Sequence, residues 1–268
     1  MTKIKDIQNQ TDKREIRINK VGVKGLKYPI ILEDRENGKQ NSIAKVNMYV
    51  ELPHQYRGTH MSRFVEILNH YHKETIVENL ESLLFEMKKK LNANVAYIEL
   101  EFLYFIKKKA PVSKEESLMS YKCKFDAHFG NEYIFEMSVT VPVITLCPCS
   151  KEISEFGAHN QRTYVTARIS YKDFVWLEEL IKIIEKSGSS ELYSLLKRSD
   201  EKYVTEKSYN NPKFVEDLVR EVAERLKSDP RITSYKIEAE SIESIHNHNA
   251  YAMVEGKKLT TKTQRHKE

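Results

Sequence analysis

The sequence has few of the features that mark secreted or membrane proteins. It contains 3 cysteines among 268 residues, so a disulfide framework is excluded and the odd count suits a reducing cytosol. No apolar run approaches the roughly 20 residues of a membrane span. Residues 1–15 are polar and lack the apolar core of a signal peptide. We therefore expect a cytoplasmic protein with no membrane partner.

Strong charge of one sign is also missing. The net charge is +5, and the basic residues are interleaved with acidic residues except in the tail. A nucleic-acid groove usually shows a stronger basic stripe with aromatic residues between the charges, so we expect no nucleic-acid partner. The glycine-rich motifs of dinucleotide and P-loop sites are absent as well, which argues against a doubly wound sheet.

The hydrophobic pattern predicts a soluble, globular chain of mixed secondary structure. With 268 residues and 40% hydrophobic content, the chain is long enough to bury a sizeable core. Period-two alternation and helical stripes predict an order of two strands, two helices and two strands. These elements are strands 16–32 and 43–52, helices between 59 and 91, and strands 94–107 and 118–128.

The same order begins again after a predicted turn at Phe129–Glu132. The second set consists of strands 133–146 and 162–170, helices 172–186, 191–196 and 212–227, and strands 232–241 and 250–254. Strands joined mostly by hairpins predict an α+β fold with antiparallel sheets and helices on one face. The expected organisation is a disordered lead (1–15), two units (16–130 and 131–255) and a polar tail (256–268).

The most informative stretch is TLCPCSKEISEFGAHNQRTY, Thr145–Tyr164. In an extended C-x-C segment, Cys147 and Cys149 would point to the same face. A thiolate and an imidazole both bind Zn²⁺ and related ions, so Cys147 and His159 are candidate metal ligands, with the other thiol free for chemistry. The alternative is a pair of buried cysteines with a surface histidine.

Three further segments carry candidate functional groups. ESIESIHNHNAY places Glu243, His246 and His248 at the end of a predicted strand, as ligands, acid/base groups or solvated side chains. DEKYVTEKSYNNPKFVED contains Glu201 and Glu216, which the pattern alone favours as solvated acids. RGTHMSRF precedes a predicted helix, and its cationic side chains suit phosphate oxygens: Arg57, His60 and Arg63.

Together these four segments resemble the prokaryotic type IB GTP cyclohydrolases. The quoted motifs are long, and the resemblance covers residues from about 15 to about 255. It implies two tandem tunnelling-fold units, each an antiparallel sheet with two helices between its second and third strands. It also implies a homotetramer with active sites at subunit interfaces. The implied reaction converts GTP to formate and 7,8-dihydroneopterin triphosphate, for folate and for queuosine-type bases.

The resemblance also implies roles for individual residues. The divalent metal, which can be zinc, manganese or iron, is assigned to Cys147, His159 and Glu201. Cys149 resembles an essential thiol that is not a ligand, and Glu216 resembles the carboxylate that anchors guanine. The proton-transfer groups are Glu243, His246 and His248, and the triphosphate is assigned to Arg57, His60 and Arg63.

Two other functions remain open at this point. One is a different tunnelling-fold enzyme, such as a pterin synthase or a nitrile reductase, although these lack the spacing between CPCS and GAHNQR. The other is a metal-binding module without enzymatic activity.

Overall fold

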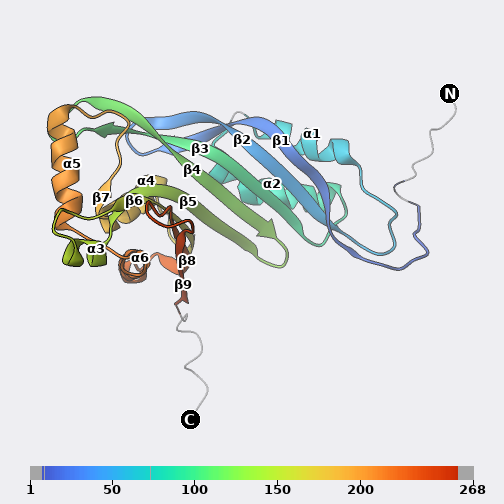
Figure 1. Cartoon of the computed structure of the whole chain (residues 1–268). Helices are drawn as coiled ribbons and strands as arrows, with labels where there is room; N and C mark the ends of the chain where they lie inside the picture. The colour runs from blue at the N-terminus through green and yellow to red at the C-terminus, as the bar shows by residue number, and fades with distance from the viewer. Residues whose placement is uncertain (1–7, 9, 73, 259–268) are drawn as a thin grey trace, which may run out of the picture. The chain divides into compact units, whose positions relative to one another are not determined.

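The computed structural model describes residues 8, 10–72 and 74–258. The strands pair in the order β1-β2-β3-β4-β5-β6-β8-β9, with β7 on β5, which confirms the predicted α+β class with antiparallel pairing (Figure 1). The strands are β1 Ile18–Asp34, β2 Gly38–Leu52, β3 Ala96–Lys109, β4 Glu116–Phe129, β5 Tyr133–Leu146, β6 Asn160–Tyr171, β7 Ser190–Glu191, β8 Ile232–Ser241 and β9 Ala250–Lys257. The helices are α1 Met61–His70, α2 Ile76–Lys90, α3 Pro148–Ile153, α4 Leu177–Ser187, α5 Arg198–Asn210 and α6 Val215–Ser228.

The internal contacts of the chain divide it into two compact units. The first unit comprises residues up to 103 together with residues 124–136, and the second comprises residues 104–123 together with those from 137 on. The hairpin 104–123 belongs to the second unit because its side chains form hydrogen bonds with residues of that unit. The Tyr104 hydroxyl donates to Glu178 at 2.6 Å, and Lys108 Nζ donates to Glu185 at 2.6 Å. This division differs from the expected boundary at residue 130, and the tandem repeat itself stays a prediction.

In the first unit, β2 pairs with both β1 and β3. The register of β1 shifts at Gly25, which has a φ of +77° and whose N–H donates to the buried Asn47 side chain at 2.8 Å. The predicted inner face of α2 is buried, including Leu80, Leu83 and Leu84. Each such leucine contributes about 1.5–3 kcal/mol on burial, so this stripe holds α2 in place.

In the second unit, β6 lies between β5 and β8, and β9 pairs with β8. Helices α4 and α6 bury apolar stripes that include Leu180, Ile184, Leu218, Val222 and Leu226. Helix α6 packs against β8 and β9. These packed helices therefore support the strands β5, β6 and β8.

The structure corrects several predicted helices. The helix expected at 172–186 begins at Leu177, and the helix expected at 191–196 is absent, with β7 at its start. The helix expected at 212–227 begins at Val215, because the Asp217 carboxylate accepts from the Phe214 N–H at 3.1 Å and caps it there.

Helices α3 and α5 were not predicted. Helix α5 is polar, and only Asp200, Val204 and Ser208 are buried on it, so it lacks the apolar stripe that reveals a helix in a sequence.

The two ends of the chain are only partly described. Within the part of the expected tail that the structure describes, Gly256 and Lys257 belong to β9. The predictions for residues 1–7, 9 and 259–268 lie outside the described residues. Across the described ranges, no helix is both long enough and apolar enough to cross a bilayer.

Candidate functional site

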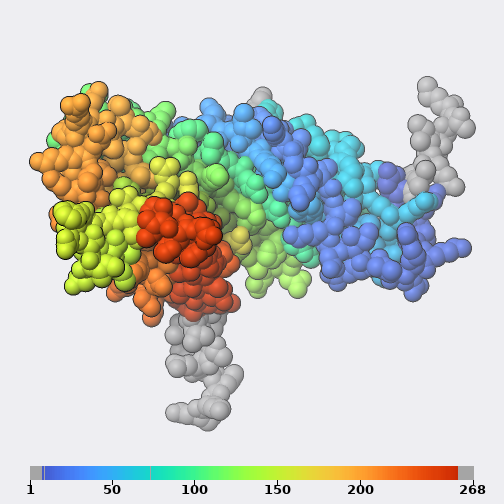
Figure 2. Space-filling view, viewed as in Figure 1, coloured from blue at the N-terminus to red at the C-terminus, as the bar shows by residue number. Residues whose placement is uncertain are grey.

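Strand β5 leads to Cys147, and the chain returns to the sheet at His159, just before β6. The Cys147 N–H donates to the His159 carbonyl at 3.1 Å, and the His159 N–H donates to Ser150 Oγ at 3.2 Å. These bonds close the intervening loop. The segment that follows Cys147 lies at the molecular surface, drawn in yellow-green (Figure 2). The fold thus brings the predicted thiol and imidazole to neighbouring backbone positions.

The two cysteines of this loop have different surroundings. Cys147 is half-buried at the N-cap of α3, where its Sγ accepts from the Ser150 N–H at 3.4 Å. Cys149 lies inside α3 and is exposed. Because α3 is helical, side chains two positions apart do not face each other. The extended geometry that would place both thiols on one face is therefore wrong.

The His159 ring is held through its Nδ1 atom. Gln161 Oε1 lies 2.9 Å from Nδ1, and Ser244 Oγ lies 3.4 Å from it. A histidine whose Nδ1–H donates to a neighbouring oxygen keeps the lone pair of Nε2 available, and this is the usual state of an imidazole that binds a metal. The half-buried ring is therefore in a setting that suits a ligand.

The donor set fits a divalent ion in part. One thiol and one imidazole are ligands for zinc and for other borderline transition metals. Among residues 8, 10–72 and 74–258, however, no group of three or more His, Cys, Asp or Glu side chains is gathered to hold a metal ion.

Glu201 is exposed in the first turn of α5. Helix α5 meets α3 at its other end, where Lys151 Nζ donates to the Tyr209 carbonyl at 2.6 Å and lies 4.4 Å from the Tyr209 ring centroid. Eight residues of helix separate Glu201 from Tyr209, about 12 Å along the axis. This separation explains why Glu201 does not join Cys147 and His159 in one group.

Glu216 is exposed near the start of α6, at the same end of the unit as Cys147. The link is a backbone bond: the Lys213 N–H donates to the Leu146 carbonyl at 3.0 Å, one residue before Cys147. The Asn211 amide adds a second anchor by donating to the Gly188 carbonyl at 3.1 Å. The segment before Glu216 is therefore fixed beside the loop that carries the cysteines.

The connection between β8 and β9 carries Glu243, His246 and His248. It is a loop, not the extended strand in which the two histidines would share a face. Their exposed rings stack instead, with centroids 5.1 Å apart and planes at 15°. Ser244 follows Glu243 in this loop, and its hydroxyl group lies 3.4 Å from His159 Nδ1. The structure thus brings the predicted proton-transfer segment to the Cys147–His159 loop.

Arg57, His60 and Arg63 belong to the first unit. His60 is the N-cap of α1, so the helix begins at Met61, within the range expected for it, and neither Thr59 nor Ser62, the two caps that the sequence offers, is the N-cap. The Arg63 guanidinium donates to the Lys90 carbonyl at 3.0 Å at the end of α2. Arg57 donates to Gln10 Oε1 at 3.2 Å and is exposed. Their predicted role at the triphosphate remains untested.

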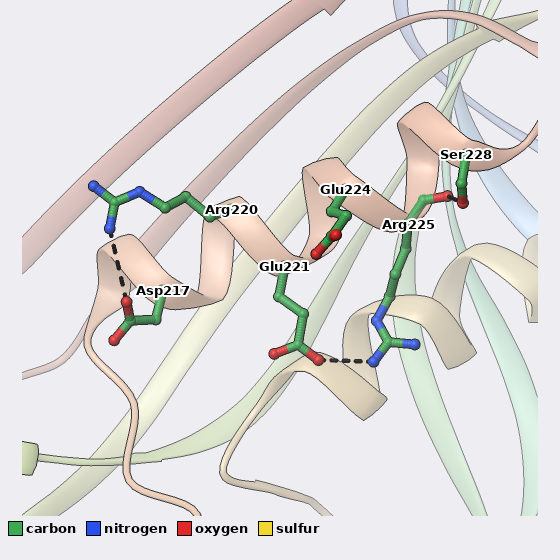
Figure 3. A pocket seen from close by; sticks show the side chains of 6 residues that line it. All are labelled: Asp217, Arg220, Glu221, Glu224, Arg225 and Ser228. Atoms are coloured by element: carbon green, nitrogen blue, oxygen red, sulfur yellow. Dashed lines mark hydrogen bonds and ion pairs between the residues drawn. The ribbon is translucent and has the colours of Figure 1, made fainter.

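A shallow pocket lies along α6, but it is separate from the candidate site (Figure 3). Two of its carboxylates are paired within the helix: Arg225 donates to Glu221 at 2.7 Å, and Arg220 lies 3.7 Å from Asp217. Glu216 does not line the pocket. The pocket is therefore a surface feature of one helix and contains none of the predicted site residues.

Sequence reasoning missed the side chains that support the site, chiefly Gln161, Ser150 and Ser244. For Gln161 a signal existed. Residues two apart share a face of a strand, so an amide two positions after His159 at the start of β6 can reach the ring. No sequence signal indicates Ser244, because its approach to His159 depends on the β8–β9 loop.

Comparisons with known proteins agree on one family. A family model described as type I GTP cyclohydrolase folE2 matches residues 4–252. The "GTP cyclohydrolase FolE2" of Geotalea uraniireducens is 54% identical over 250 residues, which are 93% of this chain and 92% of that protein. The protein of the same name from Geobacter metallireducens is 53% identical over 261 residues, covering 97% and 100% of the two chains.

Solved structures of low sequence identity share the fold. A uricase from Bacillus fastidious has a TM-score of 0.57 at 10% identity and covers 90% of this chain and 93% of that one. The uricase from Arthrobacter globiformis has a TM-score of 0.52 at 10% identity, with coverages of 92% and 95%. At this identity the likeness concerns the fold alone.

Proposed function

Because this chain belongs to the type I GTP cyclohydrolase FolE2 family, we propose a residue-level account of its chemistry. The chain is a GTP cyclohydrolase of folate biosynthesis, which hydrolyses GTP to 7,8-dihydroneopterin triphosphate and formate. The family match decides against the two alternatives, a different tunnelling-fold enzyme and a metal-binding module without activity.

The observation that supports the site most directly is the joining of Cys147 to His159. Their backbones bond at 3.1 Å, and the contact of His159 Nδ1 with Gln161 Oε1 at 2.9 Å favours the tautomer that leaves the lone pair on Nε2. We propose that Cys147 Sγ and His159 Nε2 hold a divalent ion, zinc, manganese or iron, and that Glu201 completes the set. When bound, such an ion supplies Lewis acidity that makes a water nucleophilic near neutral pH.

The chain's own residues would bind the substrate and move its protons. Glu216 would accept from the N1–H and the 2-amino group of guanine, and Arg57, His60 and Arg63 would bind the triphosphate. The stacked His246 and His248, with Glu243, would donate a proton to N7 as the imidazole ring opens and take part in the later sugar rearrangement. Cys149, exposed beside Cys147, would act as a thiol that is not a ligand.

The third metal ligand bears on assembly. Within one chain Glu201 lies about two helical turns from the contact of α5 with α3. A homotetramer with active sites at its interfaces, in a cytoplasmic setting, would let a second copy bring this carboxylate to the Cys147–His159 pair. GTP is the small-molecule partner in this proposal.

The test is turnover of GTP by the purified protein with zinc, manganese or iron(II), measured as formate released and as pterin fluorescence after oxidation. We expect activity with at least one metal, none after chelation, and none with ATP. His159→Ala should lose both bound metal and turnover. Full activity of His159→Ala would contradict the metal-site assignment.

A further inference from the structure

Three buried hydroxyl groups form a cluster that connects to His159 through Gln161. Thr145, Thr163 and Ser241 are 1%, 0% and 2% exposed and come from the neighbouring strands β5, β6 and β8. Thr145 Oγ1 lies 2.7 Å from Thr163 Oγ1, which lies 3.0 Å from Ser241 Oγ. Thr145 Oγ1 is also 3.5 Å from Ser241 Oγ. We call these three residues the hydroxyl ladder.

Gln161 connects this ladder to His159. Its Nε2 lies 3.4 Å from Thr145 Oγ1, and its Oε1 lies 2.9 Å from His159 Nδ1. Gln161 is the direct antiparallel partner of Thr145, and Thr163 is the direct partner of Ser241. The pairing of the strands therefore sets the spacing of the whole chain of hydrogen bonds.

The direction of these bonds follows from the donor count of each hydroxyl group. A hydroxyl group has one proton to donate, and Thr163 donates its proton to Ser241. Thr163 must then accept from Thr145, whose own proton is thereby used. Thr145 can only accept from Gln161, so Gln161 presents its NH₂ group to Thr145 and its carbonyl oxygen to His159.

This orientation of the amide sets the state of the imidazole. A carbonyl oxygen at Nδ1 requires that Nδ1 carry the proton, which leaves the lone pair on Nε2. The opposite amide orientation would place a donor at Nδ1 and put the proton on Nε2, where it would prevent ligation. Ser244 Oγ, 3.4 Å from Nδ1, can accept from the same N–H.

We propose that Gln161 is a positioning residue and that the hydroxyl ladder holds its amide so that His159 offers Nε2 to the metal. The inference rests on the proposed role of His159 as a ligand. Sheet packing alone does not require the hydroxyl groups, because valine has the shape of threonine and a high strand propensity. Their buried polar atoms are satisfied by one another and by Gln161.

The test compares metal affinity with fold stability in matched variants. Gln161→Met keeps the length of the side chain but removes the acceptor, whereas Gln161→Glu keeps an acceptor at Nδ1. Affinity is measured by competition for Zn²⁺ with a chromophoric chelator, and the thermal midpoint is measured on the metal-free protein. Loss of an outer-shell partner of a ligating histidine typically weakens metal affinity about 10- to 100-fold.

We expect Gln161→Met to weaken Zn²⁺ binding by about that factor while the metal-free midpoint stays near that of the wild type. Gln161→Glu should bind within a few-fold of the wild type. Equal weakening in both variants, or no weakening in Gln161→Met, would overturn the proposal. If neither Gln161→Met nor His159→Ala weakens Zn²⁺ binding, both the role of Gln161 and the metal-site assignment fail. If His159→Ala loses Zn²⁺ binding but Gln161→Met does not, only the role of Gln161 is overturned.

A second pair of hydroxyl groups on β5 and β6 provides a control for the hydroxyl ladder. Thr166 Oγ1 lies 2.8 Å from Thr140 Oγ1 across β5 and β6, at a site that does not contact His159. Thr163→Val should weaken Zn²⁺ binding, and Thr166→Val should leave it unchanged. Equal effects from the two variants would show a general effect of cross-strand hydroxyl groups and would overturn the role of the ladder.

Discussion

Cys147 and Cys149 are separated by one proline, yet the structure gives them different environments. Cys147 accepts a backbone hydrogen bond and lies next to His159, whereas Cys149 is exposed on α3. The third thiol, Cys123, is buried in the core, and burial raises its pKa well above the usual range. Of the three thiols, only Cys147, at the N-cap of α3, and Cys149, within α3, are accessible enough for chemistry.

We therefore predict that Cys147→Ala loses metal and turnover together, while Cys149→Ala keeps the metal and still loses turnover. The reason is that only Cys147 stands beside the imidazole donor. Metal content of both purified variants, measured with GTP turnover on the same samples, decides the matter. Equal loss of metal from both would place Cys149 in the coordination shell.

A second prediction at the residue scale concerns Glu216 as the selector of guanine. Glu216→Gln replaces one carboxylate oxygen with a donor, so GTP turnover should fall by at least about two orders of magnitude, because hydrogen bonds to charged groups contribute about 1.5–3 kcal/mol each. Metal content should not change. ATP should remain a poor substrate throughout, since sites built on hydrogen bonds reject analogues that cannot form them.

The neighbouring acid provides the control for this variant. Asp217 caps α6 by accepting from Phe214 N–H at 3.1 Å, so Asp217→Asn should affect stability more than turnover. Near-normal turnover in Glu216→Gln would exclude the anchor role. Loss of metal from that variant would mean that Glu216 and Glu201 have exchanged roles.

At the scale of elements, helix α5 is held by a single buried acid. Asp200 is fully buried and accepts from the Val112 and Ser113 N–H groups at 2.8 and 2.9 Å, from Ser113 Oγ at 2.6 Å and from Lys197 N–H at 2.9 Å. It therefore joins the tip of the β3–β4 hairpin to the start of α5. Glu201, the next residue, is exposed.

These two adjacent acids should separate stability from chemistry. Asp200→Ala leaves buried N–H groups without an acceptor, so the thermal midpoint should fall by several degrees. Glu201→Gln should leave the midpoint within about a degree, as surface substitutions usually do, while turnover falls. Circular dichroism melts and GTP assays on both variants provide the measurement. A stable Asp200→Ala protein would show that α5 is held by other contacts.

The connection from α6 to β8 predicts a dependence of stability on pH. Hydrogen bonds from the Arg231 side chain hold the pKa of Asp229 below its usual range, with burial acting in the opposite direction. A carboxyl whose pKa is lowered on folding stabilises the native state above its unfolded value, about 3.9. That contribution is lost as the pH falls below about 4, through the folded value.

We expect Asp229→Asn to lose about 1 kcal/mol of unfolding free energy at pH 7. The difference from the wild type should shrink as the pH falls toward 3, because the wild type then loses the same interaction. Urea unfolding of both proteins at pH 7, 5 and 3, at one protein concentration, gives the comparison. A difference that grows on acidification would contradict the sign of the argument.

At the scale of the whole molecule, the buried core does not depend on the candidate metal donors. The core includes Val139, Leu180, Leu218 and Ile237 in the second unit, whereas Cys147 and His159 lie on a half-buried loop at the end of the sheet. The protein should therefore keep its fold without a metal ion, unlike small domains that a metal holds together.

Chelation tests this prediction directly. Removing the divalent ion should abolish GTP turnover while a cooperative thermal transition remains, with a midpoint lowered only by the amount that ligand binding contributes. Restoring the ion should restore turnover. Unfolding on chelation would instead assign the ion a structural role.

The sequence by itself determined the α+β class and most of the strands, and it pointed to the segments of the candidate site. Alternation and motif spacing are local properties, so β5 and β8 are predicted at their observed bounds, 133–146 and 232–241. The CPCS to GAHNQR spacing likewise predicts Cys147 and His159 as metal ligands. Helix α5 was missed because a helix held by Asp200 and few apolar residues leaves no periodic signal.

Only the tertiary structure decided which side chains support the site. The hydroxyl ladder needs β5 and β6 to pair in one register with β8, which is distant in the sequence, and this pairing places Thr145, Thr163 and Ser241 together. The approach of Ser244 to His159 depends likewise on the conformation of the β8–β9 loop. Contacts between distant segments are fixed by the pairing of the sheet, and no local pattern records them.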